Sequence, residues 1–266
     1  MTTTTFHAGI DIGSVMTKCV IIAPDGVQTR DIARTGARAE ETAEQVFAAA
    51  LRKAGLKREQ VECVATTGYG RRLFAGAHQV ITEISAAATG AFISLGGKSC
   101  FVLDVGGQDT KVIEVNSEGQ ISDFLMNDKC AAGTGRFLEM MAHIFDTDCA
   151  GLSALALDAD APVTINSTCS VFAESEVISL IARAARRENI AAGLFAAIAG
   201  RIAVMAGHFS IDRPLVFCGG GAKSAALKAA LEKAIDLPLI ILSEPQFITA
   251  FGAALVAGRP LDYRAA

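Results

Sequence analysis

The 266-residue chain has no tryptophan, only two tyrosines and no block of basic residues. Its 28 acidic and 24 basic side chains give a formal net charge of −4, which argues against a nucleic-acid-binding surface. The first residues lack the positive charge of a secretory signal, and the apolar strand that follows is interrupted by Asp11. We therefore expect a protein that is not exported and has no nucleic-acid partner.

Long membrane-spanning runs and closely paired cysteines are missing as well. The most apolar stretch, residues 190–209, contains Arg201 and is rich in alanine and glycine, which predicts a buried core helix and no membrane partner. The seven cysteines are odd in number and widely spaced. A disulfide framework is therefore not expected, and the composition fits the reducing cytoplasm.

The sequence contains an internal repeat. Residues 10–22 align without a gap with residues 103–115, and Asp, Gly, Thr and Lys coincide in the two copies. The match continues into turns at residues 24–26 and 117–119. Each copy predicts a strand, a tight glycine turn, a second strand, a hairpin and a third strand. A repeat with this long spacing indicates duplicated domains rather than a solenoid.

Each half then continues in a similar way. A buried strand from residue 61 enters a glycine loop near Gly68, and residues 215–218 enter the run Gly219, Gly220 and Gly221. After each loop we expect a helix, a short segment and another helix. The economical architecture is an α/β fold of two lobes with a cleft between them. We assign residues 1–97 to the first lobe and 98–266 to the second, with a last helix that can cross back to the first.

Two cysteines precede predicted helices. Cys130 is followed by small residues and an amphipathic run, and Cys169 precedes a second run with helical spacing. A helix N-terminus favours a thiolate or an anionic metal cluster. Two thiolates are half of a four-cysteine cluster, so a symmetric homodimer would supply the rest. The remaining cysteines fall mostly in or near predicted strands and are expected to be structural: Cys19, Cys63, Cys100, Cys149 and Cys218.

The repeated glycine turns are suited to phosphate. A strand that ends in Asp and turns through Gly places a carboxylate beside exposed N–H groups, so the amides can bind phosphate oxygens while the carboxylate holds hydrated Mg²⁺. The first turn comprises Asp11, Gly13 and Ser14, with Lys18 nearby, and the second comprises Asp104, Gly106 and Gly107. The triple-glycine loop with Ala222 allows an adenosine to approach the backbone.

This pattern resembles the actin, Hsp70 and sugar-kinase superfamily of ATPases over nearly the whole chain. The resemblance implies a duplicated ribonuclease-H-like, two-lobe ATPase that closes over Mg-ATP. The turns at Asp11 and Asp104 match the two phosphate motifs, and the loop at residues 219–222 matches the adenosine motif. Gln108 is the best candidate for orienting the attacking water, while Asp104 or Asp109 are alternative bases.

Three longer motifs, at residues 104–109, 127–138 and 167–179, resemble the ATP-dependent activators of 2-hydroxyacyl-CoA dehydratases, the BadF/BadG/BcrA/BcrD type. This family includes ATPase subunits of benzoyl-CoA reductase. The resemblance implies a homodimer bridged by one [4Fe–4S] cluster, held by Cys130 and Cys169 of each subunit. It also implies that ATP hydrolysis drives an electron to a partner dehydratase, with ferredoxin or flavodoxin as the electron donor.

Other functions remain open on the residues alone. The chain could be the ATPase subunit of a benzoyl-CoA-reductase-type enzyme, or a small-molecule kinase, although a kinase needs a substrate pocket with a catalytic carboxylate. A nucleotide-switched, chaperone-like protein would need a long peptide-binding extension. The same four cysteines could also hold zinc at an interface.

Overall fold

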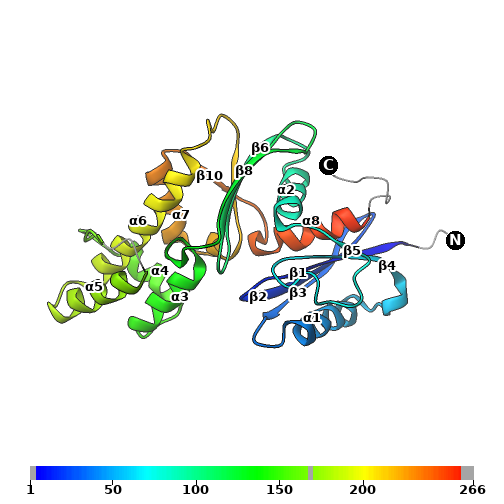
Figure 1. Ribbon diagram of the computed structural model, residues 1–266, viewed down its shortest axis with the longest axis horizontal. Coiled ribbons are helices and arrows are strands. Elements are labelled where there is room, and N and C mark those ends of the chain that lie inside the picture. Colours follow the sequence, from blue (N-terminus) through cyan, green and yellow to red (C-terminus); the bar gives the residue numbers. More distant parts are fainter. Residues whose placement is uncertain (1–3, 167–169, 259–266) are drawn as a thin grey trace. The chain divides into compact units, whose positions relative to one another are not determined.

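The computed structural model describes residues 4–166 and 170–258. The chain divides into two compact units, drawn in Figure 1. The first unit comprises residues 1–100, 114–123 and 246–266, and the second comprises residues 101–113 and 124–245. Cys169, one of the two predicted cluster ligands, lies outside the described residues.

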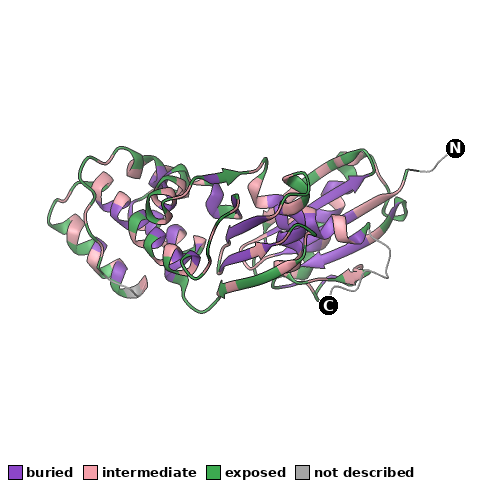
Figure 2. Ribbon diagram, turned by 90° about the horizontal axis from the view of Figure 1, so that it is seen from above, coloured by how far each residue is buried: buried purple, intermediate pink, exposed green. Residues whose placement is uncertain are grey.

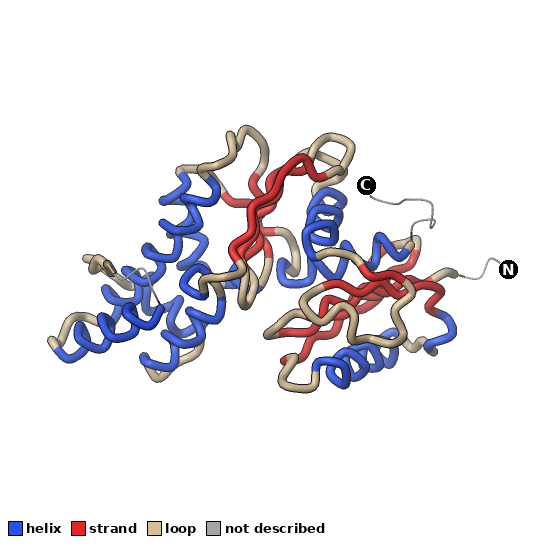
Figure 3. Tube along the Cα trace, in the orientation of Figure 1, coloured by secondary structure: helices blue, strands red, loops and turns tan. Residues whose placement is uncertain are grey.

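The first unit is built on a five-stranded sheet with the order β3-β2-β1-β4-β5. The central strand β1 pairs antiparallel with β2 and parallel with β4. The red strands of Figure 3 show this sheet beside its helices. The strand bounds are β1 Phe6–Ile12, β2 Met16–Ala23, β3 Gly26–Arg34, β4 Val61–Thr67 and β5 Gln79–Val80.

Both faces of this sheet are covered by helices. Helix α1 (Ala39–Ala54) packs its apolar side against one face, and α8 (Ile248–Ala257) covers the other together with α2 (Glu83–Ser94). Figure 1 shows α1 and α8 on opposite sides of the sheet. Because both faces are buried, β1 reads as a nearly continuous apolar run rather than as an alternating one.

Helix α8 approaches the sheet and α2 at backbone distance. A Cβ added at Gly9 of β1 would lie 2.0 Å from the carbonyl oxygen of Ala250, and one added at Gly252 of α8 would lie 1.8 Å from that of Ala86. Only glycine fits at such spacings. The absence of side chains at these positions therefore sets how closely this layer packs.

The second unit is built on a sheet with the order β10-β9-β6-β7-β8, which repeats the strand order of the first. Its strands are β6 Cys100–Val105, β7 Thr110–Val115, β8 Ile121–Asn127, β9 Leu215–Cys218 and β10 Leu239–Ile241. Its helices are α3 Gly135–Ile144, α4 Cys149–Leu157, α5 Ser170–Ala182, α6 Arg187–Ala206 and α7 Ala225–Ile235. The short helices of the chain are η1 Arg58–Gln60, η2 Ala131–Gly133, η3 Gly220–Lys223 and η4 Pro245–Phe247.

Helix α6 is the apolar segment noted in the sequence. By length and composition it could cross a membrane, but 56% of its most apolar window is buried inside the fold. Ile190, Leu194 and Ile198 of this helix are fully buried in the main apolar cluster of the second unit. Figure 2 shows buried positions in purple along the strands and on parts of the helices. The prediction of a core helix agrees with this packing.

The α/β class and the duplicated strand pattern are confirmed by the two matching sheets. One local prediction is wrong, since no helix follows the first glycine loop. Residues 68–78 form turns instead and lead directly to β5. Glycines at positions 68, 70 and 76 explain the difference, because glycine disfavours helix and Gly68 has a φ of +91°.

Candidate functional site

The first phosphate turn is closed by an ion pair. Asp11 lies at the carboxyl end of β1 and is 5% exposed. Its Oδ2 accepts a 2.8 Å hydrogen bond from Lys18 Nζ on β2. Behind the turn, the Thr35 hydroxyl donates to the Gly13 carbonyl at 2.7 Å and lies 2.9 Å from the Thr17 hydroxyl. Since Thr35 has a single proton, Thr17 must donate to it. Thr17 on β2 and Thr35 after β3 therefore hold the turn in place.

The second turn has a related but different arrangement. Asp104 is the residue before the last in β6, as Asp11 is in β1, and the aligned lysine, Lys111, is almost fully buried. Its Nζ lies 2.7 Å from Asp109 Oδ1 and 3.9 Å from Asp104 Oδ2. The Gly106 amide donates to the Asp109 carbonyl at 2.9 Å and closes the turn. Gln108, at its tip, is exposed.

Each phosphate turn is contacted by a glycine with positive φ from the neighbouring parallel strand. A Cβ at Gly68 would lie 2.6 Å from Asp11 Oδ1, and one at Gly219 would lie 2.2 Å from Asp104 Oδ1. The φ values are +91° and +83°. These glycines leave room for the Asp carboxylates, so the duplicated units share this detail as well as their strand order.

The donor set of these turns fits hydrated Mg²⁺ and phosphate. Mg²⁺ keeps several waters and commonly binds through one or two carboxylates, and each unit offers one buried Asp beside glycine amides. Lys18, whose side chain is partly exposed, can offer positive charge to a phosphate, whereas the ammonium of Lys111 is buried against Asp109. Asp11, Gly13, Ser14 and Lys18 lie together in the first unit, and the second unit brings together Asp104, Gly106, Gly107, Gln108 and Asp109.

The triple-glycine loop has two kinds of glycine. Gly219 and Gly221 are required by the fold, because added Cβ atoms would lie 2.2 Å from Asp104 and 2.8 Å from Val105. Gly220 meets nothing within 4 Å. Ala222 is buried in η3. Gly220 is therefore the position of this loop where the backbone can be approached from outside.

Cys130 is exposed and opens a turn rather than a long helix. It is the N-cap of the short helix η2, and α3 begins only at Gly135. The Asn127 side chain fixes the loop from both sides, because its Oδ1 accepts from the Cys130 amide and its Nδ2 donates to the Cys130 carbonyl, each at 3.2 Å. An exposed thiol at the start of a helical turn could serve as a ligand of an iron–sulfur cluster.

The Cys130 loop is fastened to the second phosphate turn, all within the second unit. The Thr110 hydroxyl donates to the Gly133 carbonyl at 2.7 Å. The Gly135 and Arg136 amides, at the start of α3, donate to the Gly106 and Gly107 carbonyls at 2.9 and 2.8 Å. These contacts satisfy the first N–H groups of α3. Three direct hydrogen bonds therefore connect the phosphate turn with the segment that follows Cys130.

A fourth contact comes from the apolar helix α6. Arg201 donates from Nη1 to the Ala132 carbonyl at 2.9 Å. The sequence marked Arg201 only as an interruption of an apolar run, whereas the structure gives it a partner in η2. Thr110 and Asn127 were also missed as site residues, because the hydrogen bonds they form depend on the tertiary fold and not on a motif.

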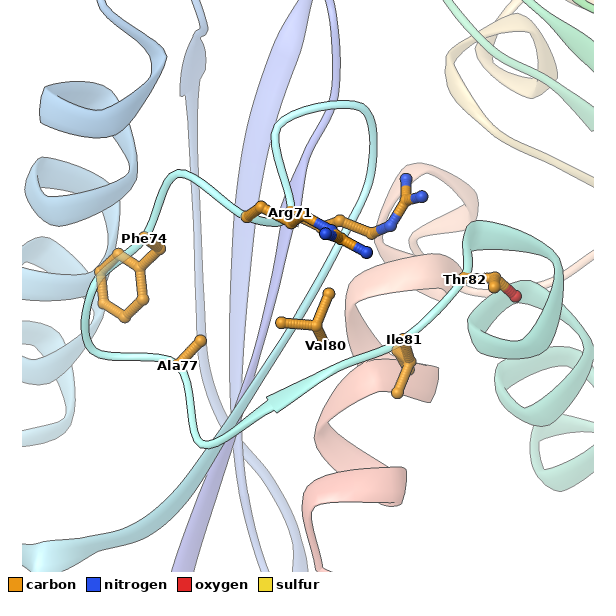
Figure 4. Close-up of a pocket in the computed structure, with 7 residues that line it drawn as sticks. Arg71, Phe74, Ala77, Val80, Ile81 and Thr82 are labelled. Carbon is orange, nitrogen blue, oxygen red and sulfur yellow. The ribbon is translucent and has the colours of Figure 1, made fainter. Parts of the chain in front are cut away.

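A cavity of about 600 Å³ opens in the first unit beside Gly68. Its walls come from the segment between β4 and α2, as Figure 4 shows. Arg71 donates to the Gly68 carbonyl at 3.1 Å, and the Gly70 amide donates to the Ile12 carbonyl at 2.8 Å. Arg71 and Arg72 line the cavity, and no acidic side chain is among its lining residues. The cavity is therefore electrostatically suited to an anionic group.

The other cysteines differ from Cys130 in their surroundings. Cys19, Cys63, Cys100 and Cys218 lie in strands, as predicted, and Cys149 begins α4. Burial, with a smaller effect from Asp31, raises the pKa of Cys19 well above its usual range. Burial also raises the pKa of Cys63, with help from Glu62. Both shifts disfavour the thiolate forms of Cys19 and Cys63.

The fold and its paired carboxylate turns define a two-lobe ATPase of the actin, Hsp70 and sugar-kinase type. The ROK-family glucokinase of Streptomyces griseus, solved with glucose and AMPPNP, matches with a TM-score of 0.56 at 14% identity, over 95% of this chain and 99% of that one. At this identity the likeness concerns the fold alone.

The chain belongs to the BadF/BadG/BcrA/BcrD ATPase family, whose model matches residues 8–257. The 2-hydroxyisocaproyl-CoA dehydratase activator of Clostridioides difficile is 38% identical, over 95% of this chain and 94% of the relative. A solved structure of the activator of the 2-hydroxyisocaproyl-CoA dehydratase from Clostridium difficile with bound ADPNP has a TM-score of 0.90 at 36% identity, covering 95% and 94% of the two chains. A benzoyl-CoA reductase subunit of Thauera aromatica is 31% identical, over 94% of this chain and 92% of that one.

Proposed function

We propose that this protein is a cytoplasmic, ATP-hydrolysing activator that works as a homodimer. It carries one [4Fe–4S] cluster per dimer and delivers a low-potential electron to a 2-hydroxyacyl-CoA dehydratase. A ferredoxin or flavodoxin reloads the cluster. Family membership supports the ATPase part, and the names of similar relatives support the dehydratase partner.

The observation that carries this proposal is the connection between the second phosphate turn and the Cys130 loop. Thr110, Gly135 and Arg136 form hydrogen bonds that join the two segments at 2.7 to 2.9 Å. A change in the turn when phosphate binds or leaves would be passed to the loop through these bonds. The exposed Cys130 thiol in that loop is available as a cluster ligand.

The nucleotide site would be formed by the residues of both turns and the glycine loop. Lys18 would bind a phosphate oxygen, and Asp11 and Asp104 would hold the waters of Mg²⁺. The amides of Gly13, Ser14, Gly106 and Gly107 would bind phosphate oxygens, and residues 219–222 would lie along the adenosine.

Gln108 is the residue that we propose to orient the attacking water. Its exposed side chain follows Gly107 at the tip of the second turn, and its amide can accept from the water and donate to a phosphate oxygen. We expect Gln108→Ala to keep ATP binding and to slow turnover, since the loss of one such contact costs roughly 2–4 kcal/mol of transition-state stabilisation. Unchanged turnover would remove Gln108 from the mechanism.

Cys130 and Cys169 are the proposed cluster ligands. Within the described residues, no group of three or more His, Cys, Asp or Glu side chains could hold a metal ion, so a cluster on Cys130 would need ligands from elsewhere. A twofold-related copy would supply them. When bound, the cluster supplies a one-electron centre whose potential depends on its hydrogen bonds and exposure.

Anaerobic purification tests the proposal. We expect about four irons and an equivalent amount of sulfide per dimer, together with ATPase activity and activation of a dehydratase by the reduced protein. Cys130→Ser should abolish the cluster and leave nucleotide binding intact, whereas Cys63→Ser, in the first unit, serves as the matched control and should keep both. Zinc in place of iron, or a monomer without metal, would contradict the proposal.

A second candidate is the ATPase subunit of a benzoyl-CoA-reductase-type enzyme, supported by the relative from Thauera aromatica. The two candidates differ in assembly. A separate activator would form a stable homodimer and activate a dehydratase when mixed with it. A reductase subunit would need the other subunits of that enzyme before it transferred electrons. Reconstitution with and without those subunits distinguishes the two candidates.

A further inference from the structure

Thr67, the last residue of β4, has a buried hydroxyl with no hydrogen-bond partner among residues 4–166 and 170–258. The whole residue is 0% exposed. A buried polar group without a partner is unfavourable, because it has lost its hydrogen bonds to water. In a native fold such a group therefore calls for a specific reason.

The neighbour of Thr67 is the carboxylate of the first phosphate turn. Thr67 is paired with Asp11 in the β1–β4 ladder, where neighbouring strands lie about 4.8 Å apart. Ala65 of β4 and Gly9 of β1, two residues earlier in each strand, both pack toward α8. Because side chains alternate along a strand, Thr67 and Asp11 share that face of the sheet.

The second unit offers an internal comparison. There β9 pairs with β6 so that Cys218 is opposite Asp104, and Gly219 follows it with the contact that Gly68 makes after Thr67. Cys218 is fully buried. A thiol thus fills the equivalent position, so packing at this position does not itself require a hydroxyl. The hydroxyl of Thr67 needs another explanation.

We propose that Thr67 is a positioning residue for Asp11. Its hydroxyl donates a hydrogen bond to Asp11 Oδ1 when Lys18 leaves Oδ2 for a nucleotide phosphate. In the structure Lys18 holds Oδ2 at 2.8 Å, and Oδ1 faces Gly68, the residue directly after Thr67. The proposal rests on the proposed function, since it requires phosphate beside the first turn. A bond made only in the bound arrangement favours that arrangement.

Two variants separate this role from packing. Thr67→Val keeps the size and shape of the side chain and removes the hydroxyl, while Thr67→Ser keeps the hydroxyl. For Thr67→Val we expect kcat to fall about tenfold or more, the factor associated with a hydrogen bond to a charged group. The Kd for ATP should rise as well, because the lost bond belongs to the bound arrangement. Thr67→Ser should stay near the wild-type kcat.

Thermal unfolding gives a readout that is independent of turnover. Without nucleotide, Thr67→Val should melt no lower than wild type, because the hydroxyl it removes has no partner. The rise in melting temperature on adding a non-hydrolysable ATP analogue should be smaller than in wild type. If the wild type is active and Thr67→Val keeps the wild-type kcat, the inference about Thr67 is wrong while the proposed function stands. Equal losses of kcat in Thr67→Val and Thr67→Ser would also overturn only the inference about Thr67. A wild-type protein without ATPase activity would overturn the proposed function as well.

Discussion

Gly68→Ala is the substitution that most directly tests how the first turn is built. Gly68 has a φ of +91°, and a Cβ there would lie 2.5 Å from the Ile12 carbonyl oxygen and 2.6 Å from Asp11 Oδ1. Gly55, at the end of α1, is the matched control. It also has a positive φ, +67°, but an added Cβ would meet nothing within 4 Å.

Both variants place an alanine at a positive φ, but only in Gly68→Ala does the added Cβ overlap neighbouring atoms. A non-glycine residue in the left-handed region costs about 1–2 kcal/mol, so Gly55→Ala should lower the free energy of unfolding by about 1 kcal/mol. Gly68→Ala adds an overlap with backbone and a buried carboxylate, which cannot move freely, and overpacking of this kind costs about 1–3 kcal/mol more. We therefore expect a total loss of about 3 kcal/mol for Gly68→Ala.

Urea unfolding followed by circular dichroism measures the loss of stability, and phosphate release measures turnover. Gly55→Ala should keep the wild-type rate, whereas Gly68→Ala should lose most of it, because the Asp11 carboxylate must move to make room for the methyl group. If both variants were equally stable and equally active, the close contact between Gly68 and the phosphate turn would not exist in solution.

Two further predictions concern the thiols and the helix packing. In the native, metal-free protein, iodoacetamide should modify exposed Cys130 well before buried Cys19, as peptide mass spectrometry would detect, and equal rates would contradict the burial of Cys19. Gly252→Ala should lower the free energy of unfolding by about 3 kcal/mol or more, because its Cβ would overlap the Ala86 carbonyl. The control Gly200→Ala, in open space on α6, should raise it by about 0.5–1 kcal/mol, and equal effects of the two in urea unfolding would refute the close packing.

Much of the fold follows from patterns that are local in the sequence. The gapless repeat predicted the Asp–Gly turns after β1 and β6 and the hairpins that follow, and the two sheets have the same strand order. Strands around residues 61 and 215 were also predicted, because β-branched runs ended in glycine. The turns at residues 68–78 were mistaken for a helix, since the comparison with the second half outweighed the glycines within the segment itself.

The contacts within the candidate site were harder to predict from the sequence than the fold. A buried hydroxyl such as that of Thr67 is visible only when its surroundings are known, because threonine is common in strands. The sequence predicted that Gly219 contacts the adenosine, and the structure adds a role in the fold itself, because Gly219 leaves room for the Asp104 carboxylate. Such contacts join residues that are distant in sequence, and no short motif encodes them.

The two copies of the turn also use identical residues for different purposes. Thr17 donates within its own sheet to Thr35, which in turn holds the Gly13 carbonyl. Its counterpart Thr110 donates instead to Gly133, in the loop after Cys130.

The acidic residues that bind the two aligned lysines also differ between the copies. Asp109, which aligns with Met16 of the first copy, takes the Lys111 ammonium at 2.7 Å, whereas Lys18 bonds directly to Asp11. The first turn is therefore closed upon itself, and the second is the one joined by hydrogen bonds to the cysteine loop. If ATP controls the cluster, the second turn is the direct route to the Cys130 loop, because the described hydrogen bonds of the first turn stay within its own unit.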